Sequence, residues 1–228
     1  MKAFIIHTPH QKSIEYAQQA LDSFKDYSGW EPELFEGLTP ETLGEFEHTN
    51  KIDTKKNSRA ECYLRDSPDR YVIKKCCSLN HYRLFKRCVA LNTPIAVIEH
   101  DAHCIGDWVN LSFDDVLVMN IESAIEQKPF SHIRRNITSP VEGLHDVNIA
   151  GLNYRHDPAL KNAHIMPGTA AYAITPAGAA KMISVYETAG WEQSDFIINT
   201  AHVRIQTIMP ELFTFKLPNL EMSHGRNM

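Results

Sequence analysis

The sequence contains the stretch Thr93-Pro-Ile-Ala-Val-Ile-Glu-His-Asp-Ala-His103, in which a short apolar run ends in two carboxylates, Glu99 and Asp101. An apolar run of this length is typical of a buried strand in a parallel sheet. Open sheets of this kind bind ligands just beyond the carboxyl ends of their strands. Because an unpaired carboxylate is costly to bury, we predict that the two acids bind a divalent cation, Mn²⁺ or Mg²⁺, which prefers oxygen ligands.

Strand and helix patterns alternate on both sides of this stretch, which predicts an α/β fold. The predicted strands are 2–7, 33–36, 94–98, 116–119, 170–174 and 205–209. The predicted helices begin at Ser13, at Pro40, at Ser78, at Pro176 and at Ser194, the last of them running to Thr200. Ser13 and Ser78 are expected to cap their helices, whose core-facing residues would be Ile14, Ala17, Leu21 and Phe24 in one and Leu79, Tyr82, Phe85 and Val89 in the other.

The length of 228 residues suits one domain over 1–228, with a long loop at 49–70, an insertion at about 127–168 and a C-terminal tail at 220–228. No stretch approaches the length of apolar sequence that a membrane span needs, and the apolar run at the N-terminus is too short for a signal peptide. The five cysteines form no Cys-x-x-Cys pair, so reduced thiols are expected rather than disulfides or a zinc site. These features predict a cytoplasmic protein.

Charge is unevenly distributed along the chain. Residues 51–87 carry 11 basic and 4 acidic side chains, although the whole chain has a net charge of −5. Such a block predicts an anionic ligand that contacts the basic residues around 55–59 and 83–87, or else a basic face that is simply solvated.

Three further side chains are candidates for the site. Strand alternation places His100 on the side opposite Glu99 and Asp101, whereas His224 in the tail would add a nitrogen ligand to the same cation if the tail folds back. Asp195 lies at a predicted helix start, where a carboxylate acts either as a general base or as a partner of the helix dipole.

The order of several motifs resembles glycosyltransferase family 25, the lipooligosaccharide galactosyltransferases and their relatives. The motifs are Leu34-Phe-Glu-Gly37, Cys76-Cys-Ser-Leu-Asn-His81, Ile98-Glu-His-Asp-Ala102, Gly168-Thr-Ala-Ala-Tyr-Ala-Ile174 and Ser194-Asp-Phe-Ile197. The chain departs from the family pattern at His7-Thr8, where the family has Asn-Leu, at Cys76 and Asn80 within the second motif, and at His100, where the family has a middle acid.

The resemblance implies a GT-A-type, Rossmann-like mixed sheet flanked by helices and an inverting transfer of a sugar from a nucleotide diphosphate donor, a UDP-sugar, to a hydroxyl of a glycan or lipooligosaccharide-like acceptor. It implies Asp195 as the general base, with Glu192 as second choice. The resemblance places a divalent metal at the acid triplet, and the predicted metal ligands are Glu99, Asp101 and, from the tail, His224. The implied donor-binding residues are His7, Thr8, Arg59, His81, Glu99, His100, Asp101, Gly168 and Thr169.

Three alternatives stay open on the sequence. A glycosyltransferase acting on hydroxylated bases in DNA would use the basic block to bind a nucleic acid as its polyanionic acceptor. A metal-dependent phosphoesterase would need further ligands near the acids, such as His103. A sugar-nucleotide binder without activity would explain the missing middle acid.

Overall fold

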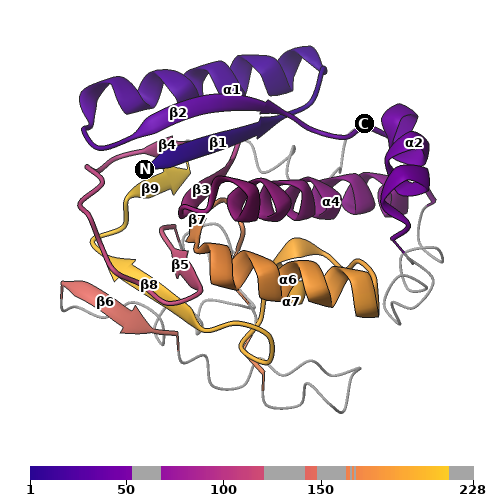
Figure 1. Ribbon diagram of the computed structural model, residues 1–228. Helices are drawn as coiled ribbons and strands as arrows, with labels where there is room; N and C mark the ends of the chain where they lie inside the picture. The colour runs from indigo at the N-terminus through magenta and orange to yellow at the C-terminus, as the bar shows by residue number, and fades with distance from the viewer. Residues whose placement is uncertain (53–67, 121–141, 148–162, 165, 167, 216–228) are drawn as a thin grey trace, which may run out of the picture.

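The chain forms a mixed sheet of seven strands with helices on both faces (Figure 1). The strand order is β2-β1-β3-β7-β5-β8-β6, and β4 and β9 make a separate antiparallel pair. The computed structural model describes residues 1–52, 68–120, 142–147, 163, 164, 166 and 168–215. This architecture confirms the predicted α/β class with a Rossmann-like mixed sheet flanked by helices.

Nine strands and five α-helices make up the described part of the chain. The strands are β1 (Lys2–His7), β2 (Glu31–Glu36), β3 (Ile95–Glu99), β4 (Ala102–Cys104), β5 (Val116–Val118), β6 (Gly143–Asp146), β7 (Ala171–Ile174), β8 (Ile205–Met209) and β9 (Phe213–Phe215). The helices are α1 (Gln11–Ser23), α2 (Pro40–Asn50), α4 (Pro68–Leu91), α6 (Pro176–Ala189) and α7 (Ser194–Ile197), with a short 3₁₀ helix η1 (Phe24–Asp26). Helix α7 is shorter than predicted. Strands β4, β6 and β9 were not predicted from the sequence.

The first unit is β1-α1-β2, with β1 parallel to both β2 and β3 as predicted. The predicted cap at Ser13 was wrong, because α1 begins two residues earlier with His10 as its N-cap. Ser13 is instead buried, and its hydroxyl accepts a hydrogen bond from the backbone N–H of Thr8 at 3.0 Å. This bond ties the loop after β1 to the helix. Ala17 and Phe24 are buried and Leu21 packs against the core as predicted, whereas the prediction for Ile14 was wrong, because 39% of its surface is exposed.

Helix α4 is longer than predicted and begins at Pro68, since proline is well tolerated in the first turn. Ser78 therefore lies inside the helix, and its predicted role as a cap was wrong. It is fully buried, and its hydroxyl pairs with the Tyr186 hydroxyl at 2.7 Å. Leu79, Tyr82 and Phe85 face the core as predicted. Val89 does not, because 40% of its surface is exposed.

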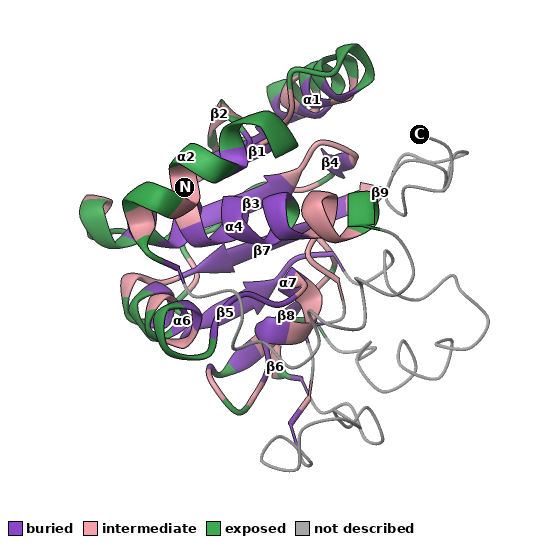
Figure 2. Cartoon of the chain, turned by 90° about the vertical axis from the view of Figure 1, so that its right-hand side faces the viewer, coloured by how far each residue is buried: buried purple, intermediate pink, exposed green. Residues whose placement is uncertain are grey.

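Two apolar cores lie on the two faces of the sheet, since successive side chains of a strand point to opposite faces. Phe4 of β1 and Val97 of β3 pack with α4 and α6, which lie side by side across one face (Figure 1). Ile5 and Ile98 pack with α1 and the β4–β9 pair on the other face. The buried strands run through the centre of the molecule in Figure 2, whereas α1 and α2 expose polar outer faces.

Strand β7 positions the site because it runs antiparallel between β3 and β5. Its first residues therefore lie beside the carboxyl end of β3, where the Glu99 N–H donates to the Ala170 carbonyl at 2.8 Å. Helix α6 follows as predicted, with the Thr175 hydroxyl accepting from the Gly178 N–H at 3.1 Å. No helix within the described ranges is long and apolar enough to cross a membrane.

Candidate active site

Glu99 ends β3 on the face that α4 covers, as the alternation from Val97 requires. The Thr169 hydroxyl donates to Glu99 Oε1 at 2.6 Å, and His81 Nε2 lies 3.7 Å from the same oxygen. Burial opposes ionisation here, but His81 and the Thr169 hydroxyl outweigh it and lower the pKa of Glu99. Glu99 is therefore an ionised carboxylate at the carboxyl edge of the sheet.

Asp101 lies two residues beyond Glu99, in the turn after β3. Its Oδ1 atom is buried and has no hydrogen-bond partner among the described residues. Burial and the negative charge of Glu99 raise the pKa of Asp101 to about 7. A buried carboxyl group with an unsatisfied oxygen is rare in folded proteins and needs a partner from outside the chain or a proton.

Asp195 is the second residue of α7 and is the third acid of the site, within electrostatic reach of Glu99. Burial raises its pKa to about 6, with a further contribution from Glu99, against the opposing hydrogen bond with Gln193. A helix of only 4 residues has a weak dipole, which favours a chemical role over dipole stabilisation. Glu192 is more enclosed, at 6% exposure, and its Oε1 accepts from the Gln193 N–H at 3.0 Å.

His100 points to the opposite face from Glu99, as strand alternation predicted. Its ring stacks on Tyr16 with centroids 6.1 Å apart, and Nδ1 lies 3.4 Å from the Ser13 hydroxyl. Burial lowers the pKa of His100, and the nearby His7 imidazole adds to this, while Glu99 opposes it. His7, Thr8 and His100 thus lie together at the carboxyl ends of β1 and β3. Because position 100 faces away from Glu99, the histidine that replaces the family's middle acid removes no carboxylate from the Glu99 side.

Comparison of the chain with known protein families gives a match. The sequence profile of glycosyltransferase family 25 (LPS biosynthesis protein) matches residues 30–198. The chain belongs to glycosyltransferase family 25. It is therefore a glycosyltransferase. No curated protein matches the chain.

The cation expected in this family 25 enzyme was tested against the described side chains. They contain no group of three or more histidine, cysteine, aspartate or glutamate residues arranged to hold a metal ion. The unsatisfied Oδ1 of Asp101 next to ionised Glu99 nevertheless fits a cation, which would relieve both burial and repulsion. The predicted ligand His224 and the predicted donor contact Arg59 lie outside the described residues.

Basic residues of α4 were expected to contact the pyrophosphate or an anionic acceptor. In the structure each of the three predicted cations has a partner within the protein, which favours a structural role for this face. The partners are the Glu36 carbonyl for Arg83 at 2.9 Å, Asn50 for Lys86 at 3.0 Å and Glu33 for Arg87 at 3.5 Å. The DNA alternative loses its main structural support at these positions. Residues 55–59 lie outside the described part of the chain.

His103, the extra ligand that a phosphoesterase would need, lies in β4 and is 7% exposed. It belongs to no metal-binding group of the described residues. Together with the family assignment, this leaves the phosphoesterase alternative without support.

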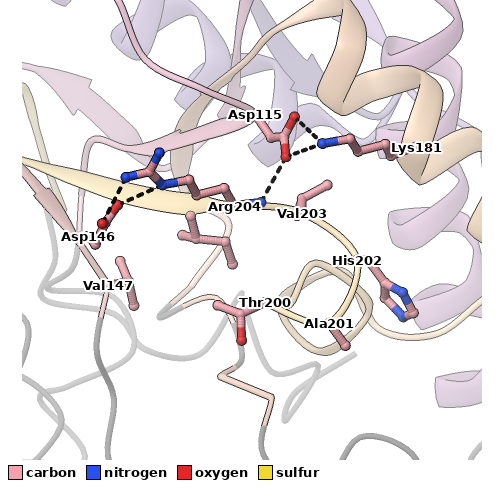
Figure 3. A pocket seen from close by; sticks show the side chains of 10 residues that line it. Asp115, Asp146, Val147, Lys181, Thr200, Ala201, His202, Val203 and Arg204 are labelled. Atoms are coloured by element: carbon pink, nitrogen blue, oxygen red, sulfur yellow. Dashed lines mark hydrogen bonds and ion pairs between the residues drawn. The ribbon is translucent and has the colours of Figure 1, made fainter.

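A cleft of about 420 Å³ lies at the opposite edge of the sheet, where β5 and β8 begin (Figure 3). Asp115, which lines the cleft, accepts from Lys181 Nζ at 2.8 and 2.6 Å and from the Arg204 N–H at 2.8 Å. The Arg204 guanidinium pairs with Asp146 in turn. The charges of this cleft satisfy one another.

Sequence reasoning missed two residues beside the site. Tyr172 was seen only as part of a motif, yet its hydroxyl lies 2.8 Å from His81 Nδ1. Tyr16 was not considered, although it stacks on His100. Period-2 alternation along β7 would have placed Tyr172 on the Glu99 face, but no sequence pattern pairs Tyr16 with His100 across 84 positions of chain.

Proposed function

We propose that this family 25 glycosyltransferase moves a sugar from a nucleotide diphosphate donor to a glycan hydroxyl, with inversion and with the help of Mn²⁺ or Mg²⁺. The observation that carries the proposal is the buried Asp101 carboxyl, with its unsatisfied oxygen beside ionised Glu99. Two negative groups forced together at a strand end are stabilised by a cation that also binds a diphosphate.

Glu99 and Asp101 are the described residues that would hold the cation. When bound, the cation would supply positive charge for the departing diphosphate. His7, Thr8 and the Tyr16–His100 pair border the same edge of the sheet on the α1 side, where the nucleoside end of the donor would lie. A uridine nucleotide is the expected donor nucleotide.

Asp195 is proposed as the base that takes the proton of the attacking hydroxyl. A carboxyl group with a pKa raised to about 6 is ionised near neutral pH and is still a better proton acceptor than an ordinary aspartate. A single attack on the face of the sugar opposite the leaving group inverts the anomeric carbon. The acceptor is proposed to be a lipooligosaccharide-like glycan, in line with the family description of LPS biosynthesis.

The test combines binding with product analysis. Isothermal titration of the chain with UDP should show affinity that rises when Mn²⁺ is present, with GDP and ADP as controls for the nucleotide. The chain should then be incubated with UDP-galactose, UDP-glucose or UDP-N-acetylglucosamine and with galactose- or lactose-ended acceptors. NMR of the product should show that the new linkage has the inverted anomeric configuration. UDP binding that is unchanged by chelation of the metal would contradict the cation, and a retained linkage would contradict the inverting step.

A further inference from the structure

His81 lies behind Glu99 rather than on the ligand side. Its side chain is 2% exposed, and its ring stacks on Tyr172 with centroids 5.7 Å apart and planes inclined by 14°. Tyr172 itself is fully buried. A side chain so enclosed has almost no surface to offer a donor, so any effect on binding must pass through a neighbour.

That neighbour is Glu99, and the contacts fall on one of its two oxygens. Oε1 accepts from the Thr169 hydroxyl at 2.6 Å and lies 3.7 Å from His81 Nε2. These are the contacts that the structure gives the Glu99 carboxylate among its described residues, and Oε2 receives none of them. One oxygen is fixed by the protein, and the other is left for a ligand.

The Tyr172 hydroxyl is the hydrogen-bond partner of His81 Nδ1. Burial raises the pKa of Tyr172 well above its usual value, so the phenol keeps its proton. With the phenol as the donor to His81 Nδ1, 2.8 Å away, the remaining ring proton lies on Nε2, facing Glu99. The order is Tyr172 O–H to Nδ1, then Nε2–H toward Oε1.

We propose that Tyr172, His81 and Thr169 are positioning residues that orient Glu99 so that Oε2 is presented to the divalent cation of the donor complex. The proposal rests on the proposed function, because it assumes that a cation binds at Glu99. Groups that orient a metal ligand are typically worth about 10–100-fold in metal affinity. Thr169 acts directly on Glu99, and Tyr172 acts on it through His81.

The test is titration of the folded chain with Mn²⁺ in the presence of UDP, read by calorimetry and by the EPR signal of free Mn²⁺. Thr169→Val removes the hydroxyl and keeps the shape, so Mn²⁺ affinity should fall by about 10–100-fold. Thr169→Ser keeps the hydroxyl and should stay within about twofold of the wild type. A loss in Thr169→Ser with wild-type affinity in Thr169→Val would mean that the methyl group, not the hydrogen bond, matters, and this would overturn the role of Thr169.

Tyr172→Phe has a matched control in Tyr186→Phe. Both tyrosines are fully buried, but the Tyr186 hydroxyl bonds to Ser78 and not to the His81–Glu99 pair. Tyr172→Phe should weaken Mn²⁺ binding by about tenfold, whereas Tyr186→Phe should lower thermal stability only. Equal effects of the two variants on Mn²⁺ binding would overturn the proposal.

The tautomer gives a readout that a merely structural role would not move. Long-range ¹H–¹⁵N NMR of the His81 ring, assigned with His81→Asn, should show a protonated Nε2 and an accepting Nδ1. In Tyr172→Phe this pattern should change. A ring protonated at Nδ1 in the wild type would overturn the order of donors. Failure of the wild type to bind Mn²⁺ at all would overturn both this inference and the proposed cation, whereas equal binding by the wild type and Thr169→Val would overturn this inference alone.

Discussion

The two edges of the sheet each carry a buried or half-buried aspartate, and they treat it in opposite ways. At the edge where β5 and β8 begin, Asp115 is 5% exposed and is fully bonded to Lys181 and to the backbone of Arg204. At the carboxyl edge, Asp101 leaves a buried oxygen without a partner in the described part of the chain and faces the charge of Glu99. The cleft of about 420 Å³ lies beside the satisfied aspartate.

The difference follows from what each edge does. A carboxylate that has its partners within the protein stabilises the fold and gains little from a ligand. A carboxylate held among like charges without a partner destabilises the free protein, and it persists where a ligand supplies the missing charge. Unsatisfied charge, rather than the position of the cleft, is therefore what identifies the proposed active site.

The largest expected effect comes from Asp195. Asp195→Asn should lower the rate of sugar transfer by about 10²–10⁴-fold, because the amide cannot accept the proton of the acceptor hydroxyl. Binding of UDP with Mn²⁺ should change little, so the loss should appear in the single-turnover rate. Glu192→Gln serves as the comparison and should have a smaller effect, because the Glu192 carboxylate is buried against its own backbone neighbour.

Two outcomes would contradict the assignment of the base. Full activity in Asp195→Asn together with a loss in Glu192→Gln would exchange the two roles. Full activity in both variants would place the base elsewhere, including the residues that the structure does not describe.

The next effect separates the two aspartates directly. Asp101→Asn should weaken Mn²⁺-dependent UDP binding by at least about 10–100-fold and leave the fold intact, because it removes a charge that the free protein does not use. Asp115→Asn should do the reverse. It should leave UDP binding unchanged and lower the free energy of unfolding by about 1–3 kcal/mol, since Lys181 loses its buried partner.

Calorimetry with UDP and Mn²⁺ measures the loss of binding, and urea denaturation of both variants measures the loss of stability. If Asp115→Asn also abolished UDP binding while still folded, the satisfied edge would belong to the site. If Asp101→Asn bound UDP and Mn²⁺ as the wild type does, the unsatisfied oxygen would have no ligand to explain it.

A third effect is the dependence of stability on pH in the metal-free protein. The pKa of Asp101 is about 7 in the folded state, against an ordinary value of 3.8. Between these values the folded protein keeps a proton that the unfolded chain has lost, so this group lowers the free energy of unfolding as pH rises through the range. Asn cannot ionise, so Asp101→Asn should be more stable than the wild type by roughly 1–3 kcal/mol at about pH 8 and close to equal at about pH 4.

Urea denaturation in a chelating buffer at both pH values checks this difference. The opposite sign, with the wild type more stable at the higher pH, would mean that a positive group stabilises ionised Asp101 in the free protein. The chain would then already satisfy the carboxylate.

Much of this fold could be predicted from the sequence, because long apolar strands and proline-led helix starts are local signals. The strands around Val97, Tyr172 and Ile205 and the start of α6 at Pro176 follow from such patterns. Strands β4, β6 and β9 could not be predicted, since each is a short segment that contains polar residues and is defined by its pairing. Ser13 and Ser78 were misread as caps because a hydroxyl bonded across the fold looks the same in sequence as one that caps a helix.

The candidate site was predictable to the same extent. Glu99 and Asp101 stood out because acids end an apolar strand, and the opposite orientation of His100 followed from alternation. The bond from Thr169 to Glu99 depends on β7 running antiparallel beside β3, which no local pattern specifies. The roles of Asp101 and Asp115 likewise could not be predicted from the sequence. Asp101 follows a buried strand and Asp115 precedes one, and only their hydrogen-bond partners distinguish them.

The smallest expected effect concerns the exposed ion pairs of Arg204, at the edge of the sheet that carries Asp115. Arg204 pairs with Asp114 at 2.6 Å and with Asp146 at 2.9 Å, but its side chain is 55% exposed, and such exposed pairs contribute little to stability. Arg204→Ala removes these pairs and keeps the backbone N–H that Asp115 accepts, so the Asp115–Lys181 pair should survive. Thermal denaturation should therefore show a slight loss of stability, smaller than that of Asp115→Asn, which disappears at about 1 M salt where exposed charges are screened. UDP binding and sugar transfer should be unchanged. A fall in transfer with the fold intact would mean that the charges around the cleft take part in the reaction, and the contrast between the two edges would then fail.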